Sequence, residues 1–357
     1  MIISRYIIRE IAKPLFIGCI LLTIVFASYR SAANLTDAAN GLLQPDVAVK
    51  LILLETLIAL EVLLPTALYL SVVVGLGRLH SDTEIAALQA TGVGESTILA
   101  AVLQFALVIA VAVAALSIFV RPWAYRTSHE LEAQSVVETD VTTLNAERFY
   151  PLLPTKNVLF AENVDRKQHQ MNKVFVQGDH DDHAIIVYAQ QAYRLPTDSN
   201  PRRSMKFLQG NSYDLGRYDG HDRILSFRSL TVFLPENTRV DVQQNRKAEP
   251  TTALFGSNKP KDIAELQWRL STPLATVLLA LLGVPLSRTS PRQRRHSGML
   301  VAVLIYALFF NLTGVAQTWV EQGRVGKFPG LWWAYGIPAG LLLLFLWRSA
   351  WSRRAVP

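Results

Sequence analysis

The polar side chains best placed to have a functional role lie in a short segment between two apolar runs. This segment is Arg78–Thr97 (RLHSDTEIAALQATGVGEST). Ser81 and Glu84 have the S-x-x-E spacing of a capping box, in which two side chains bond the first free amides of a helix. The residues after them predict a short amphipathic helix with an apolar stripe and a glycine stop. These residues are Ile85, Leu88, Val93, Gly92 and Gly94.

Glu84 has two possible roles in this helix. Its carboxylate either folds back to cap the helix or projects toward a partner, and the first role would compete with the second. The segment also carries Asp82 and Glu95 against Arg78, whereas the other connections expected on the same side are basic. We therefore expect Glu84 to project toward a positively charged protein.

Motifs for catalysis or nucleotide binding are absent from the sequence. There is no phosphate-binding loop, no dinucleotide fingerprint, no G-x-S-x-G and no H-E-x-x-H. His180-Asp181-Asp182-His183 could bind a metal, but consecutive residues of an extended chain point in alternate directions, so we favour a solvated turn. The single cysteine, Cys19, excludes an internal disulfide. We expect no enzyme activity, no cofactor and no metal.

Charged residues at the ends of the apolar runs are more informative, because charge is costly at membrane depth. Arg30 could attract an anionic lipid headgroup or could extend to the interface, and the sequence leaves both open. Glu265 and Arg269, four residues apart and beside Trp268, predict a structural anchor at the start of a membrane helix. Interfacial placement or pairing with a neighbouring helix is the favoured role of two further acids, Glu55 and Glu61.

Polar residues also recur within one apolar run near the C-terminus. Tyr306, Thr313 and Gln317 fall near one face of a helix. Such residues usually face protein or a cavity and not lipid. A cavity lining and helix-to-helix hydrogen bonding are both left open.

These residues are positioned by six long apolar runs. The chain has 357 residues, half of them hydrophobic, with a mean hydropathy of +0.24. Each run is long enough to cross a hydrocarbon core of about 30 Å. An amphipathic segment, Met1–Lys13, would lie in the interface before the first run. The expected membrane helices are Pro14–Tyr29, Leu51–Gly77, Ile98–Val120, Leu270–Leu286, Met299–Trp319 and Leu331–Trp347.

Between the third and fourth runs the pattern becomes that of strands separated by turns. Strands without intervening helices predict an antiparallel sandwich or jelly roll. We therefore expect three domains: residues 1–120 with the first three membrane helices and a coupling helix near 80–92, a β domain over 121–265, and three membrane helices with a basic tail over 266–357. The predicted strands are Val158–Phe160, Lys173–Gln177, Ala184–Leu195, Ser204–Leu215 and Ile224–Leu234.

The distribution of basic residues predicts the orientation. Arginines gather in SRTSPRQRRHS, at 287–297, and in the C-terminal tail. By the positive-inside rule these segments and both termini are cytoplasmic, and the β domain is periplasmic. The same rule accounts for the net charge of +7 without a nucleic-acid partner. The first run has no small-residue cleavage site, so we expect it to stay as an anchor.

Four pieces of the sequence carry a resemblance to a known family. They are MIISRYIIRE, GLGRLHSDTEIAALQATG, ELQWRLSTPL and VPLSRTSPRQRR, in this order around the inserted β domain. The chain resembles, over its whole length, the lipopolysaccharide-export permease family of double-membraned bacteria (the LptF/LptG type). The first and last pieces are more similar to the LptF branch.

The resemblance implies a permease in the bacterial inner membrane with several partners. It would pair with an LptG-type paralogue, bind a dimer of a cytoplasmic ATPase, and contact a single-helix periplasmic bridge protein. Its substrate would be lipopolysaccharide, taken from the outer leaflet and passed to a bridge of β-jelly-roll proteins. A permease that only relays the motion of the ATPase to a periplasmic partner is the alternative, and a lipid-modifying enzyme is disfavoured.

The resemblance also implies roles for individual residues. Glu84 would be the acid of the family's coupling helix, seated in a groove of the ATPase with Arg78, Ile85, Leu88 and Gly92 around it. Arg30 would meet lipid phosphates, although Ala33 stands where some members have a second basic residue. The lateral gate formed by the first and fifth helices implies cavity contacts from Phe26, Tyr306, Phe310, Thr313 and Gln317.

Overall fold

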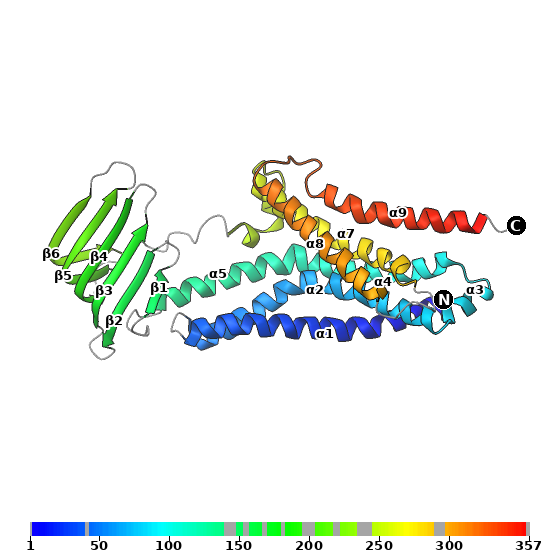
Figure 1. Cartoon of the computed structure of the whole chain (residues 1–357), viewed down its shortest axis with the longest axis horizontal. Helices are drawn as coiled ribbons and strands as arrows, with labels where there is room; N and C mark the ends of the chain where they lie inside the picture. The colour runs from blue at the N-terminus through cyan, green and yellow to red at the C-terminus, as the bar shows by residue number, and fades with distance from the viewer. Residues whose placement is uncertain are drawn as a thin grey trace. The chain divides into compact units, whose positions relative to one another are not determined.

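The apolar runs form long α-helices in the computed structural model (Figure 1). The structure describes residues 2–39, 43–138, 148–152, 157–165, 170–179, 183–194, 204–216, 222–233, 245–288 and 297–354. Two compact units are present: one comprises Met1–Arg30, Ile52–Thr127 and Asn245–Pro357, and the other Ser31–Leu51 and Ser128–Gln244.

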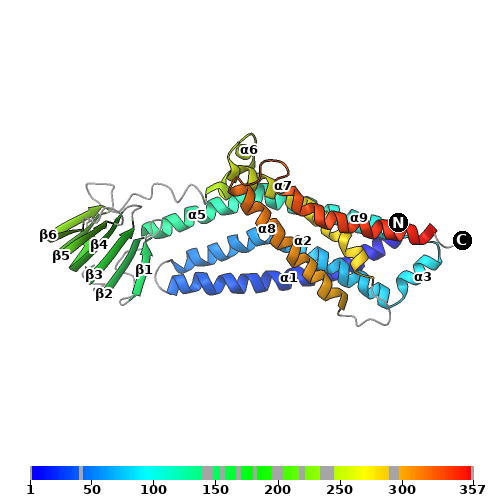
Figure 2. The same ribbon diagram turned by 45° about the horizontal axis from the view of Figure 1, so that its top comes forward.

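The first half of the chain forms a helical hairpin, a short helix and a long rod. Helices α1 (Ile2–Ala39) and α2 (Pro45–Ser81) lie side by side in two views (Figures 1 and 2). The short helix α3 (Glu84–Ala90) follows. Helix α4 (Glu95–Ala115) then continues without a break through a π-helical turn, η1 (Leu116–Val120), into α5 (Arg121–Glu138).

The expected interfacial segment and the first expected membrane helix belong to one continuous helix. Helix α1 continues through Pro14 from the interfacial residues into the apolar run. Proline is tolerated inside a membrane helix because neighbouring groups satisfy the backbone it frees.

The second half of the chain adds three long helices after two short turns. The turns are η3 (Asn245–Ala248) and α6 (Thr251–Leu254). Helix α7 (Pro260–Leu286) contacts α4, α8 (Ser297–Glu321) and α9 (Trp332–Arg354), so it lies at the centre of the helical unit.

Four of the described helical segments are long and apolar enough to span a membrane. They are Ile2–Ala39, Glu95–Glu132, Pro260–Leu286 and Gly298–Glu321. Trp332–Trp347 is a shorter apolar helix. The four segments agree with an integral membrane protein, and the expected number of six requires α2 and α9 as well.

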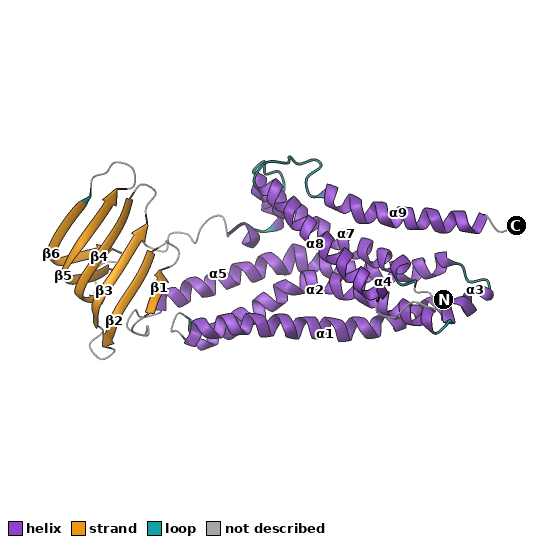
Figure 3. Ribbon diagram, viewed as in Figure 1, coloured by secondary structure: helices purple, strands orange, loops and turns teal. Residues whose placement is uncertain are grey.

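The β region forms one antiparallel sheet (Figure 3). Its order is sequential, from β1 to β6, because each strand pairs with the next one along the chain. The five predicted strands are present, and β1 was missed. The strands are β1 (Arg148–Leu152), β2 (Asn157–Asp165), β3 (Gln170–Asp179), β4 (His183–Arg194), β5 (Ser204–Gly216) and β6 (Arg223–Phe233).

The single sequential sheet differs from the jelly roll that the sequence predicted. A jelly roll needs two sheets joined by long crossovers, whereas the described strands are all hairpin neighbours. Strand periodicity reports only which face of a strand is apolar, and it carries no information on strand order. The expected His180–His183 motif lies mostly outside the described residues, as does most of the arginine-rich segment at 287–297.

The apolar alternation of this sheet shifts near two residues with left-handed backbone. Lys173 and Gln209 have positive φ, at 49° and 50°. In β3, buried Met171 is followed by buried Val174. The spacing is three positions, whereas regular strand alternation gives two. Gly210 is required there, because a Cβ on it would lie 2.2 Å from the Tyr188 carbonyl oxygen. A left-handed residue therefore lets one face stay apolar where the alternation shifts.

Candidate functional site

The coupling segment begins differently from the expected capping box. Ser81 is the last residue of α2, and its hydroxyl donates to the Arg78 carbonyl. Thr83 takes the left-handed conformation, with φ 58°, and starts α3 without a side-chain cap. The capping box is wrong because α2 extends to Ser81 and the sharp turn at Thr83 separates the two partners. Glu84 is consequently free of that role.

The C-terminal end of α3 is the one that the glycines predicted. Gly92 has φ +88°, and its amide donates to the Gln89 carbonyl at 3.0 Å. The Val93 amide donates to the Leu88 carbonyl at 3.1 Å. These two bonds form a Schellman motif, which requires a left-handed residue that glycine adopts without strain. The helix therefore has a fixed end.

Helix α3 is fixed to the start of α1 by an apolar contact. Ile85 is buried in a cluster with Ile7, Ile11, Leu79 and Ile98. This cluster joins α1, α2, α3 and α4. Ile85 is thus part of the internal packing, although the resemblance placed it among the residues around the ATPase contact.

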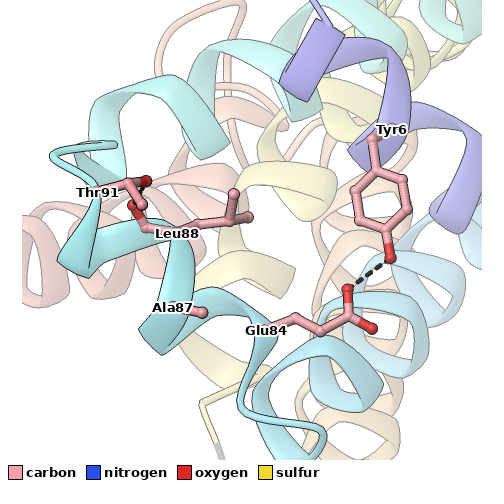
Figure 4. Close-up of a pocket in the computed structure, with 5 residues that line it drawn as sticks. All are labelled: Tyr6, Glu84, Ala87, Leu88 and Thr91. Carbon is pink, nitrogen blue, oxygen red and sulfur yellow. Dashed lines mark hydrogen bonds between the residues drawn. The ribbon is translucent and has the colours of Figure 1, made fainter.

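Glu84 lies at the edge of a pocket formed between α1 and α3 (Figure 4). The Tyr6 hydroxyl donates to Glu84 Oε2 at 2.5 Å. The pocket has a volume of about 310 Å³ and exposes mostly apolar lining. Its lining residues are Tyr6, Glu84, Ala87, Leu88 and Thr91. An apolar recess with a carboxylate at its edge suits a long cationic side chain, whose stem is apolar and whose end is charged.

The other acids of this segment have basic partners within the chain. Glu95 forms an ion pair with Arg288, and Asp82 lies 4.0 Å from Arg78. Arg78 makes its shorter contact, at 2.6 Å, with Glu10 of α1. Within the described ranges, Glu84 forms no ion pair, and its contact is with a neutral phenol. Arg78 serves the internal α1–α2 contact, so Glu84 is the acid that is left for a partner.

Arg30 is held by a neighbouring acid. Its Nε donates to Glu55 Oε2 at 2.7 Å, and its Nη2 contacts the other carboxylate oxygen. The guanidinium side chain remains 36% exposed, whereas Glu55 is 17% exposed. Glu55 thus pairs with a neighbouring helix, as expected. A phosphate that reached Arg30 would share the guanidinium with Glu55 or displace it.

The gate candidates differ in their surroundings, although the rings of Tyr306 and Phe310 stack with centroids 6.2 Å apart. The Tyr306 hydroxyl is hydrogen-bonded to Thr66 on α2, and its ring lies 6.1 Å from the ring of Tyr69. Thr313 is buried and bonds the Phe310 carbonyl of its own helix, while Phe310 is 43% exposed. Tyr306 therefore makes a hydrogen bond between α8 and α2. Gln317 bonds Glu321 within α8, and Phe26 is half-buried on α1.

A buried ion network lies at the π-helical turn of the same unit. Glu265 and Arg269 of α7 form the predicted pair, with Nε to Oε1 at 2.9 Å. Arg121 joins them, since its Nε lies 3.1 Å from Glu265 Oε1 and its Nη1 lies 2.7 Å from Glu61 Oε2. Trp268 donates to Glu61 Oε1 at 3.0 Å. Two carboxylates and two guanidiniums thus balance in charge.

The network is nearly closed to solvent and fully hydrogen-bonded. Arg269 is 0% exposed and Glu61 is 1% exposed. Arg269 also donates to the carbonyls of Glu249 and Lys247, and Ser117, in the π-turn, donates to Glu61 at 2.8 Å. Buried charges persist only with such pairing. The network therefore ties α2, α4–α5 and α7 together.

Arg121 and Ser117 were missed by the sequence analysis. Arg121 was placed at the start of the β domain, but it is the first residue of α5 and lies in the helical unit. A signal was available: Arg121 is an arginine at the end of an apolar run on the expected outward side, where the positive-inside rule does not require one. Glu61, Glu265, Trp268 and Arg269 belong to a larger site than the predicted anchor.

Comparison with known proteins agrees with the resemblance. The profile of the family described as lipopolysaccharide export system permease LptF/LptG matches residues 5–349. The chain is similar to the lipopolysaccharide export system permease protein LptF of Escherichia coli strain K12, with 25% identity over 361 residues, 99% of this chain and 97% of the relative. The protein of the same name from Shigella flexneri has the same identity and coverage.

Proposed function

Because this chain belongs to the LptF/LptG family of lipopolysaccharide export permeases, we propose that it is the membrane subunit through which a separate ATPase drives lipopolysaccharide out of the inner membrane. It crosses that membrane several times, with six helices when α2 and α9 are counted. Its termini and α3 are cytoplasmic and its sheet is periplasmic. An LptG-type paralogue completes the transport cavity.

The observation that carries this proposal is the position of Glu84. It stands on a short helix between two long ones, it has no basic partner in the described part of the chain, and it borders an apolar pocket. The sequence has no nucleotide-binding motif. Energy from ATP must therefore enter through a protein contact, and a cationic side chain of the ATPase dimer is the partner that this pocket fits.

Transport of a multi-acyl lipid requires such an energy input. Exposing acyl chains to water costs about 0.8 kcal/mol for each CH₂ group. The exposed apolar side chains of α1 suit acyl chains, and examples are Phe16, Ile17, Ile20 and Leu21. Arg30 suits the phosphates of the lipid headgroup. The periplasmic sheet serves as the platform for the single-helix bridge protein and the jelly-roll bridge.

Charge reversal at Glu84 tests the coupling role. We expect Glu84→Arg to abolish lipopolysaccharide release by the reconstituted complex, because like charges then meet in the pocket. Asp82→Arg is the matched control, since it makes the same charge change on an exposed residue outside the pocket lining. Normal ATPase binding and export by Glu84→Arg would overturn the proposal.

Photocrosslinking tests whether lipid passes along this chain. A crosslinker placed at Phe26 or Phe310 is expected to capture lipopolysaccharide in cells with an active ATPase. Tyr29, 71% exposed on α1, provides a control position for general lipid contact. The alternative is a permease that relays motion and moves no lipid itself. The Arg30–Glu55 pair is a specific observation in its favour. Capture of the bridge protein without lipid would support that alternative.

A further inference from the structure

We propose that Tyr6 is a positioning residue for the coupling carboxylate: its hydroxyl holds Glu84 in the orientation that receives the cationic side chain of the ATPase. This inference rests on the proposed function, and it assigns to the start of α1 a direct part in coupling. The carboxylate is on α3 and the phenol is on α1, 78 residues apart in sequence.

The hydrogen bond leaves the carboxylate able to bind a cation. Tyr6 donates to Oε2 at 2.5 Å, and Oε1 accepts no hydrogen bond from the described residues. An ionised carboxylate has about four acceptor positions. One phenolic bond therefore fixes the side chain while most of its acceptor capacity remains for a guanidinium or an ammonium group. Figure 4 shows the two side chains pointing toward each other from their separate helices.

Tyr6 can act as a fixed reference because its helix is anchored in the turn that directly follows it. Its neighbour Ile7 is 1% exposed, and Ile11 is 0% exposed in the cluster that also holds Ile85. Glu10 is paired to Arg78 at 2.6 Å. At Gly75 of α2, a Cβ would lie 3.2 Å from the Glu10 carbonyl oxygen, so the two backbones approach closely there.

The ring of Tyr6 also contributes to the pocket. It is 40% exposed, and it lines the recess together with Ala87 and Leu88. An arginine entering this recess would lay its stem along the apolar wall and place its planar group near an aromatic face and a carboxylate. Both contacts favour a guanidinium. The ligand class is therefore a single cationic side chain, with arginine preferred over lysine.

The expected change in ATPase affinity follows from the conformational freedom of the Glu84 side chain that the Tyr6 hydrogen bond removes. Immobilising a side chain on binding is unfavourable, and an orientation fixed beforehand avoids that loss. We expect Tyr6→Phe to weaken binding of the ATPase to the permease complex roughly 2- to 10-fold. The phenylalanine keeps the ring, so packing in the pocket is preserved.

A double-mutant cycle on the assembled permease complex tests this assignment. ATPase affinity and lipopolysaccharide released per ATP hydrolysed are measured for the parent, Tyr6→Phe, Glu84→Ala and the double variant. Tyr6→Phe is expected to lower both values in the parent and to have no further effect beside Glu84→Ala. Equal effects in the two backgrounds, or no effect in either, would overturn the positioning role.

The outcomes separate this inference from the function on which it rests. If Glu84→Ala leaves coupling intact, the proposed function of the pocket fails. If Glu84→Ala uncouples and Tyr6→Phe does not, only the role of Tyr6 fails. Tyr29→Phe is the matched control, since it removes a hydroxyl from a more exposed tyrosine of the same helix.

Discussion

Two carboxylates of the helical unit, Glu84 and Glu61, have opposite surroundings. Glu84 borders an open pocket and takes one hydrogen bond, from a neutral phenol. Glu61 is 1% exposed and is bonded by Arg121, Ser117 and Trp268. A buried charge must be compensated inside the fold, whereas an exposed charge is solvated and can remain without a charged partner in the same chain. The comparison separates a group that holds helices together from a group that, in the proposed function, binds another protein.

The largest expected effect is at Arg121. Arg121→Met keeps an unbranched apolar stem but leaves Glu61 and Glu265 without their shared cation. We expect a loss of about 3–5 kcal/mol in the free energy of unfolding, the usual cost of breaking a buried pair by removing one partner. Thermal unfolding of the purified complex measures it. An unchanged melting temperature would show that solvent reaches the network.

A smaller effect is expected when a matched pair is removed together. In Glu61→Gln with Arg121→Met, the ion pair of Glu265 and Arg269 remains, at 2.9 Å, and no unpaired charge stays buried. Most of the loss caused by Arg121→Met alone should be recovered, leaving about 1–2 kcal/mol. Calorimetry of the two variants side by side gives the difference. A double variant no more stable than the single one contradicts charge compensation as the cause.

At Glu84 the effect on stability should be small and the effect on function large. Glu84→Ala removes one hydrogen bond at a partly exposed site, so we expect a loss of at most about 1 kcal/mol. Lipopolysaccharide release per ATP hydrolysed should nevertheless fall strongly. Measuring both quantities on one preparation sharpens the comparison. A stability loss as large as that of Arg121→Met would make Glu84 a second structural site.

The smallest effect is expected at an ion pair that is exposed on both sides. Lys50 and Asp46 lie 3.3 Å apart, with side chains 57% and 61% exposed. Lys50→Ala should cost about 0.3–0.5 kcal/mol, typical of exposed pairs four residues apart on a helix. The same unfolding assay applies, and raised salt should reduce the difference further. This variant calibrates what an ion pair contributes without burial.

Much of the fold could be predicted from the residue pattern. The apolar runs, the five predicted strands and the end of α3 at Gly92 depend on periodicity and on local conformational preference. The continuity of α1 through Pro14 and the single sequential sheet could not be predicted in this way. Both depend on how neighbouring elements pack, and a proline or a strand pattern is compatible with more than one such arrangement.

The sequence alone determined the class of protein and the family resemblance, and it singled out Glu84 as an acid among otherwise basic connections. Only the tertiary structure decided which acid is free, since Arg288 pairs with Glu95 and Tyr6 bonds Glu84. It also decided that Arg121 meets Glu265, 144 residues away. Local pattern is encoded within a few residues, but compensation of charge depends on which side chains packing brings together.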